Sequence, residues 1–558
     1  MKLDFDVIVI GSGFGGSVMS LRLVEKGYQV CLLERGQEWG MNSFPRRIEE
    51  IKNQLPWSPK DKKFGFMEIR DYPDSDAMSV SGAGLGGGSL IYANVMIRMP
   101  EEFFYQWPKG IDRATLDPYY DLVEKNLEAS PYPLSTDPYY SDTKKTHSLK
   151  KVADGLTAAP GATAKPEFFL PSLTVRFKGN FPGEQSLNSH GAIQSKCNKC
   201  GECDIGCNIH AKNTLDLNYL FRARNYKGGK GPLEIRTHAE VISIESITNG
   251  DEYYKVVYRN PLKPKEEKIL YSKKVVLSAG SIHSTELLLK MKKKHFLPKI
   301  SSKLGAKWCG NGDLEGMALM TKEFLEPTKG PVITGAIRYK YEGYSDGFPH
   351  GLFIQDAGVP IGLDWYLSGK ITAGATFLQY LKLMRHFALD FIRRFFHLMM
   401  GRGGKINIGA EMLKAIDRNN FSRKLYVMLG MGRDRNDGSI SISENGEPLI
   451  NWRMDNSELH YDRAKFEMGR IAKALGGVFV NNPLTYIKKI VAVHPLGGCA
   501  MADTEQEGVV GRNGEVFGHP GLYVVDASIL PTSVGPNPSM TIAALAEMIA
   551  DQFPVVEK

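Results

Sequence analysis

Short apolar runs near both ends of the chain predict the strands of one buried parallel sheet. Residues 5–10, 29–33, 275–279 and 522–526 are almost continuously apolar and lack the alternation of a half-exposed strand. Such runs are typical of strands that are covered on both faces. Because the last run returns to the sheet that the first run begins, we expect a nucleotide-binding domain that is interrupted by inserted sequence.

The middle of the chain has a different pattern. From residue 311 to 483, apolar and polar residues alternate in short stretches, as expected for an antiparallel sheet, and residues 233–260 predict a small hairpin attached to the first domain. The predicted fold class is therefore α/β (α+β overall), with a Rossmann-like domain and an inserted antiparallel-sheet substrate domain. The nucleotide-binding domain is assigned residues 1–45, 76–128, 190–310 and 484–558, a surface excursion or lid residues 46–75, and the substrate domain residues 129–189 and 311–483.

A glycine-rich turn follows the first strand directly and leads into a predicted helix. Within residues 11–16, Gly11 permits the tight turn, Gly13 lets a pyrophosphate approach the backbone, and Gly16 lets the helix pack close to the sheet. The helix N-terminus offers free N–H groups and a partial positive charge to phosphates. Glu34, which ends the next strand, is placed to accept a hydrogen bond from a ribose hydroxyl. The pattern predicts a dinucleotide site and does not by itself separate NAD from FAD.

A second glycine-rich stretch occupies residues 81–95. Five glycines in seven positions make a poor strand and a poor helix. A flexible linker is the alternative, but linkers are polar, whereas apolar residues flank this stretch on both sides. We therefore expect backbone held against a flat ligand, with Gly87, Gly88 and Ser89 at the contact.

Four of the seven cysteines crowd into eleven residues. Cys197, Cys200, Cys203 and Cys207 have the C-x2-C-x2-C-x3-C spacing of bacterial ferredoxins, which favours an iron–sulfur cluster. Against a cluster, Asn208 stands where a proline usually follows, and no second cysteine run supplies the other half of a two-cluster arrangement. A compact cysteine-rich turn and a zinc knot are the alternatives, and we predict a turn without a metal. This crowding is not that of a disulfide scaffold, so a reducing compartment is expected.

Length and charge narrow the class of protein. The chain has 558 residues, which predicts more than one domain. Its formal net charge of +8 is modest for this length, and it suits an anionic surface such as a membrane as well as it suits no particular partner. No arginine-rich arm or zinc-finger spacing indicates a nucleic-acid partner. The first strand begins within a few residues of the N-terminus, which leaves no room for a secretory signal, and no long apolar run predicts a span. We expect a cytoplasmic protein, at most peripheral to the membrane.

Residues 377–400 form a separate amphipathic pattern. Phenylalanine, leucine and methionine recur at helical spacing, and six Lys, Arg or His residues occupy the other side. These six residues exclude a membrane span. Two interpretations stay open: an ordinary helix with a buried face, and a helix that rests on membrane lipid.

Together the motifs resemble those of the glucose–methanol–choline (GMC) oxidoreductases. The resemblance rests on residues 11–34, 86–89 and 278–282 and on His494 and Asn537, and it extends over the whole chain in the family's order. It implies FAD as the cofactor. Within the family the chain is most similar to the cholesterol oxidase-like branch, because that branch has an asparagine at the second active-site position.

The resemblance also implies roles for individual residues. His494 would position and deprotonate the substrate hydroxyl, and Asn537 would hydrogen-bond its oxygen and the reduced flavin; a satisfied core histidine is the alternative at 494. Asp526 would hold the ribityl or phosphate region, and Val241 would meet the adenine through its backbone. Asp364 follows a Gly-Leu pair and would take the place of the glutamate base that isomerises the steroid double bond in this branch, although its side chain is one methylene shorter. A loop acid without a role in catalysis is the alternative.

We therefore expect FAD-dependent oxidation of a bulky hydrophobic secondary alcohol, such as a 3β-hydroxysteroid, by hydride transfer to flavin N5. Isomerisation would be an additional step. Oxygen or another electron acceptor would reoxidise the flavin. A long-chain or terpenoid alcohol is the alternative substrate, and a non-redox flavin-dependent lyase is the alternative from another class.

Overall fold

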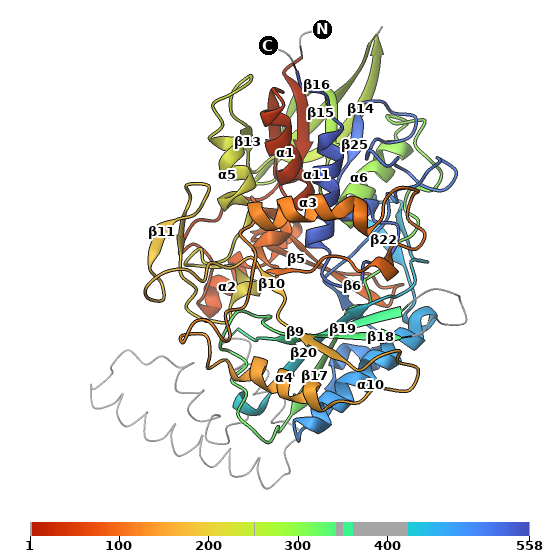
Figure 1. The fold of residues 1–558 in the computed structure, drawn as a ribbon. Coiled ribbons are helices and arrows are strands. Elements are labelled where there is room, and N and C mark those ends of the chain that lie inside the picture. The colour runs from red at the N-terminus through yellow and green to blue at the C-terminus, as the bar shows by residue number, and fades with distance from the viewer. Residues whose placement is uncertain (1–2, 250, 342–349, 361–421, 557–558) are drawn as a thin grey trace, which may run out of the picture.

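A parallel sheet extended by an antiparallel hairpin forms the centre of the computed structural model, which describes residues 3–249, 251–341, 350–360 and 422–556 (Figure 1). The strand order is β13-β2-β1-β16-β15-β14, and β25 pairs with the end of β16. The strands are β1 (Phe5–Ile10), β2 (Val30–Leu33), β13 (Glu234–Arg236), β14 (Glu240–Asn249), β15 (Asp251–Asn260), β16 (Lys263–Leu277) and β25 (Leu522–Val524). The predicted Rossmann-like domain is confirmed.

The apolar runs form the parallel part of this sheet because both of its faces are covered. Val7, Val9 and Val276 are completely buried. On the face seen in Figure 1, α1 (Phe14–Glu25), α3 (Arg113–Asn126), α5 (Tyr219–Arg224) and α11 (Ser539–Asp551) cover the strands, and α6 (Ser281–Lys293) follows β16. The single hairpin predicted for residues 233–260 is wrong in one respect. β14 and β15 form it, but β13 runs parallel to β2 at the opposite edge of the sheet.

A six-stranded antiparallel sheet forms the second layer of the molecule and lies in the lower half of Figure 1. Its order is β23-β17-β20-β19-β18-β9. Its strands are β9 (Glu167–Phe169), β17 (Leu314–Leu319), β18 (Ala336–Tyr341), β19 (His350–Ala357), β20 (Tyr426–Gly432) and β23 (Val478–Asn481), and α4 (Lys144–Gly155) and α10 (Glu458–Ala474) pack on it. Along β17 buried and partly exposed residues alternate, so one face meets the helices and the other faces inward.

The segment predicted as an irregular excursion, residues 46–75, is ordered. It contains α2 (Ile48–Gln54), β3 (Trp57–Ser58), β4 (Lys63–Phe64) and β5 (Met67–Asp71). β5 pairs with β6 (Ala77–Gly82), which in turn pairs with β24 (Ile490–Ala492), so the hairpin crosses the predicted boundary at 75. Aromatic packing explains this order, because Trp39, Phe44 and Phe66 form a small core of their own. The division into domains stays a prediction.

Two predicted features lie outside the described residues. Asp364 and the amphipathic stretch 377–400 both fall within 361–421. Among the helices that the structure describes, none combines the length and the apolar character needed to cross a bilayer.

Candidate active site

A cavity of about 950 Å³ lies between the two large sheets. Its lining begins at the glycine-rich turn and Glu34 and reaches His494 and Asn537. The structure therefore brings the predicted dinucleotide site and the predicted catalytic pair to the same space, although they are far apart in the sequence.

The turn at one end of the cavity is shaped for a phosphate group. Gly11 has φ +92°, a conformation that favours glycine, and a Cβ on Gly16 would lie 2.0 Å from the Gly11 oxygen. Gly13 is the N-cap of α1, and no side chain caps this end of the helix. A Cβ on Gly13 would meet no protein atom within 4 Å, and Gly13 lines the cavity. Free N–H groups beside open space suit a bound pyrophosphate.

Two neighbouring glycines in this turn should respond differently to alanine. Gly13→Ala is expected to fold normally but to bind FAD at least tenfold more weakly, because its methyl group enters the space that the phosphates need. Gly15→Ala is the matched control for folding, because its Cβ would lie 1.7 Å from the Val525 oxygen. It should lower the melting temperature of the protein or prevent its purification. Flavin content and thermal unfolding measure both effects, and equal flavin affinity in Gly13→Ala and wild type would contradict the prediction.

Glu34 is buried and does more than the sequence indicated. One carboxylate oxygen accepts hydrogen bonds from the N–H and hydroxyl groups of Ser12, and the other accepts the N–H groups of Gly36 and Gly84. Glu34 thus ties the two glycine-rich stretches together. It also lines the cavity. Each of its oxygens already accepts two hydrogen bonds, and the predicted contact with a ribose stays a prediction.

The remaining predicted cofactor residues separate into two groups. Gly87, Gly88, Val241 and Asp526 line the cavity. Asp526 accepts hydrogen bonds from the Gly280 N–H at 2.9 Å and from the hydroxyl groups of two serines, and burial raises the pKa of its carboxyl. Ser89 is not among the lining residues; its buried hydroxyl donates to the Gly86 carbonyl and accepts the Leu215 N–H.

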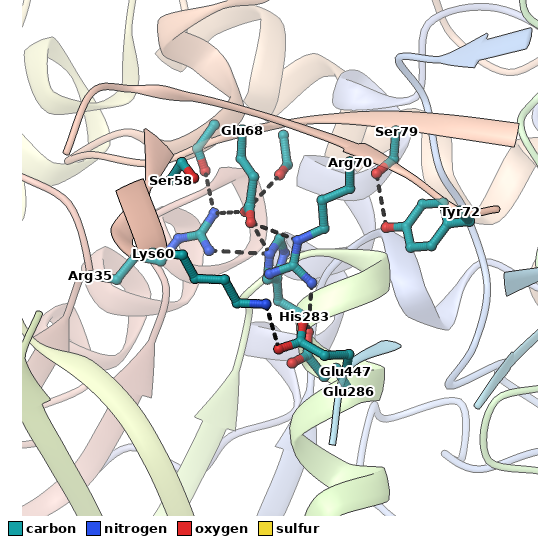
Figure 2. A network of polar contacts seen from close by, with 12 residues as sticks. Arg35, Ser58, Lys60, Glu68, Arg70, Tyr72, Ser79, His283, Glu286 and Glu447 are labelled. Carbon is teal, nitrogen blue, oxygen red and sulfur yellow. Dashed lines mark hydrogen bonds and ion pairs between the residues drawn. The ribbon is translucent and has the colours of Figure 1, made fainter. Parts of the chain in front are cut away.

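Arg35, which follows Glu34, belongs to a network of polar contacts that reaches residues 46–75 (Figure 2). The Arg35 guanidinium lies 2.7 Å from Glu68 of β5, and Glu68 also pairs with Arg70 and His283. Burial opposes the ionisation of Glu68, but Arg35 and His283 outweigh it and hold the pKa of this carboxyl well below its usual value. Arg70 pairs in turn with Glu286 of α6. An ionic network through Glu68 and Arg70 therefore fastens β5 to the Rossmann-like domain.

His494 and Asn537 lie together on the lining of the same cavity. His494 Nδ1 is 2.7 Å from Asp313 Oδ1, and Asn537 Nδ2 is 3.4 Å from His494 Nε2. Asp313 Oδ2 accepts the N–H groups of Val493 and His494, each at 2.8 Å, so the carboxylate fixes both the ring and its backbone. With Nδ1–H donated to Asp313, the imidazole presents an unprotonated Nε2 to the cavity.

Sequence reasoning missed two residues of this group, Asp313 and Gln355. Gln355 of β19 donates from Nε2 to Asn537 Oδ1 at 2.7 Å, which fixes the amide so that its NH2 group points to His494. Asp313 follows a Gly-Asn-Gly turn 181 residues before His494. The only feature of the sequence that could have indicated Asp313 is its position directly before a strand of the inserted sheet. No local pattern links it to His494.

The four clustered cysteines line a separate small cavity of about 20 Å³. All four are free thiols, and burial raises the pKa of Cys200 to about 12. Within the part of the chain that the structure describes, no three His, Cys, Asp or Glu side chains are arranged to hold a metal ion. The iron–sulfur alternative at Cys197, Cys200, Cys203 and Cys207 thus gains no support from the geometry.

Comparison with known proteins agrees with this arrangement. A family model for GMC oxidoreductases matches residues 434–546, and one for NAD(P)-binding Rossmann-like domains matches residues 9–59. A cholesterol oxidase from Mycobacterium tuberculosis is 30% identical over 99% of this chain and 92% of its own length. The chain belongs to the GMC oxidoreductase family.

More distant proteins resemble the chain over nearly its whole length. The long-chain-alcohol oxidase FAO4B of Arabidopsis thaliana is 23% identical over 99% of this chain and 67% of its own length. The crystal structure of pyridoxine 4-oxidase from Mesorbium loti superposes with a TM-score of 0.58 at 15% identity, covering 99% of this chain and 100% of that one, which shows the shared fold.

Family membership establishes the type of enzyme. This GMC oxidoreductase is an FAD-dependent enzyme that oxidises CH–OH donors. Its cavity suits that cofactor, because open space adjoins Gly13 at the free N-terminus of α1 and continues to Asn537. The predictions of FAD and of an alcohol oxidoreductase are confirmed, and the roles of individual residues stay predictions.

Proposed function

We propose that this enzyme oxidises a bulky apolar secondary alcohol of the 3β-hydroxysteroid type, with His494 and Asn537 at the hydroxyl. The observation that carries the proposal is the Asp313–His494–Asn537 group, which opens on a cavity with a largely apolar wall. The lining of that wall includes Met317, Val332, Ile333, Val359, Val427 and Leu429. The similarity to a cholesterol oxidase supports a sterol-like occupant.

In this proposal each polar residue has a task that is compatible with the geometry. His494 Nε2 accepts the hydroxyl proton, and Asp313 stabilises the resulting imidazolium through Nδ1. Asn537 Nδ2 donates a hydrogen bond to the substrate oxygen, since Gln355 holds the amide in that orientation. When bound, FAD supplies the acceptor for the hydride from the carbinol carbon. The helix α11 starts at Ser539, so its positive N-terminal end lies close to Asn537, where negative charge would be stabilised.

The expected result of a substrate panel follows from this proposal. Without oxygen, a 3β-hydroxysteroid should bleach the bound flavin at least tenfold faster than a short primary alcohol. The reason is that only the bulky substrate is large enough to contact the apolar wall of the cavity. Stopped-flow absorbance of the holoenzyme measures the bleaching. A long-chain primary alcohol should be tested in the same panel, because the chain is similar to the long-chain-alcohol oxidase FAO4B. Faster bleaching by that alcohol would replace the sterol proposal, and no bleaching by any alcohol would favour a lyase.

Two further parts of the proposal involve residues outside those described. Asp364 is proposed as the base for double-bond isomerisation, which predicts loss of the conjugated product, but not of flavin bleaching, in Asp364→Asn.

Residues 377–400 are proposed to contact membrane lipid. Their deletion should then reduce activity on vesicle-borne substrate more than on detergent-solubilised substrate, and equal losses would contradict the contact.

A further inference from the structure

One acidic side chain on the cavity wall has no part in the chemistry above. Glu315 belongs to β17, where residues facing the inside of the molecule alternate with buried ones. Asp313 precedes the strand, so Asp313, Glu315 and Met317 share one side of it. Glu315 and Met317 both line the cavity. Two residues of a strand span about 6.8 Å, so Glu315 lies about one strand step from Asp313, which holds His494, and it lines the same cavity as that histidine.

Glu315 is fixed in place, but half of its carboxyl is unused. Asn482 Nδ2 donates to Oε2 at 2.7 Å, and the side-chain oxygen of Asn482 is already occupied by the Leu484 N–H. Among the described residues, no hydrogen bond or ion pair reaches Oε1. Burial raises the pKa of Glu315 to about 7, and the negative charges of Asp313 and Asp204 add to the shift. Glu315 is partly exposed to the cavity, so a substrate that displaces water from Oε1 must supply a hydrogen bond in its place.

We propose that Glu315 is a specificity-determining residue that binds a second hydroxyl group of the substrate, about one strand step from the hydroxyl that is oxidised. The inference rests on the proposed function and deepens it. The preferred substrate is then an apolar diol, and an alcohol with a single hydroxyl leaves Oε1 unsatisfied. An ionised or neutral carboxyl can accept the hydrogen bond of a hydroxyl, so the preference persists on both sides of neutral pH.

Matched substrate pairs test the inference on the FAD-loaded enzyme. One pair is a 3β-hydroxysteroid with and without a second hydroxyl on carbon 7, and the other is a long-chain secondary alcohol with and without a hydroxyl four carbons away. Wild type should show a higher kcat/KM for the diol of a pair. Glu315→Met, which has a similar length but no hydrogen-bonding oxygen, should lower the diol preference about 10- to 100-fold and leave flavin content unchanged.

Two control variants separate recognition from a structural effect. Glu315→Gln keeps an oxygen at this position and should retain most of the preference. Met317→Leu alters the same wall of the cavity but neither adds nor removes a hydrogen-bonding group. This variant should therefore have the same diol preference as wild type. An equal preference in wild type and Glu315→Met for both pairs would overturn the inference and leave the proposed function standing. A wild-type preference for the corresponding amino alcohol over the diol would also overturn it.

The second substrate pair makes the two proposals separable. If only the linear alcohols bleach the flavin, the steroid assignment fails, while the linear pair still tests Glu315. If steroids are oxidised and the diol preference does not depend on Glu315, the inference about Glu315 fails alone.

Discussion

Replacement of His494 by alanine should lower kcat by about 10²- to 10⁴-fold while the protein keeps its FAD. Among the side chains that the structure describes, no other titratable group is hydrogen-bonded to Asn537, and His494 Nε2 is the basic atom beside its amide. The imidazole and the glycine-rich turn line the cavity from different elements, so binding of the FAD phosphates should not depend on His494. The rate of flavin bleaching in a single turnover, measured beside the flavin content, checks both parts.

A histidine that serves only the core would give a different result. The His494 side chain is 15% exposed, and its loss would then reduce thermal stability and leave the bleaching rate within a few-fold of wild type. His494→Gln is the useful companion variant, because it keeps a polar side chain of similar volume but no base. It should be as slow as the alanine variant, and a fast His494→Gln enzyme would refute proton transfer to this residue.

Asp313→Asn should lower kcat by about 10²- to 10⁴-fold, although it removes no contact with the substrate. The wild-type carboxylate accepts hydrogen bonds on both oxygens, one from the imidazole and two on the other from backbone N–H groups. An asparagine can satisfy only one of these sides, and its NH2 group then faces a donor on the other. If the amide oxygen keeps the backbone groups, Nδ1 must accept a hydrogen bond from the new NH2 group. The ring then carries its hydrogen on Nε2, the atom that should receive the substrate proton.

A second buried carboxyl provides the matched control for Asp313→Asn. Asp434 accepts hydrogen bonds from the Gly310 N–H at 2.7 Å and from the Ser533 hydroxyl at 2.6 Å, close to the turn that precedes Asp313. The imidazole of His494 is hydrogen-bonded to Asp313 and not to Asp434. Burial raises the pKa of Asp434 to about 7, so a neutral amide resembles its protonated form. Asp434→Asn should keep kcat within a few-fold of wild type. Equal losses in the two variants would show that Asp313 acts through the fold of the turn and not through the imidazole.

Local pattern was sufficient for the parts of the protein whose physics is local. The run Phe5–Ile10 and the glycines after it indicated a strand, a tight turn and a helix N-terminus, since each depends on neighbouring residues alone. Asp313 could not be found in this way, because its partner lies 181 residues away and only the docking of the antiparallel sheet brings them together. The ordered excursion was missed for a similar reason. The segment is held by the ion pairs of Glu68 with Arg35 and His283. No periodic pattern in the sequence links these two residues to Glu68.

The late position of β25 in the chain has a consequence for biosynthesis. Val275 of β16 pairs on one side with Ile8 and on the other with Leu522. While the ribosome is still making the residues between them, β15 covers only the first part of this side of β16. The end at residues 275–277 has no neighbour there, and its open hydrogen-bonding groups can recruit strands from other nascent chains. Such long-range pairing is slow to form. Low temperature and slow translation should therefore increase the yield of native enzyme during recombinant expression.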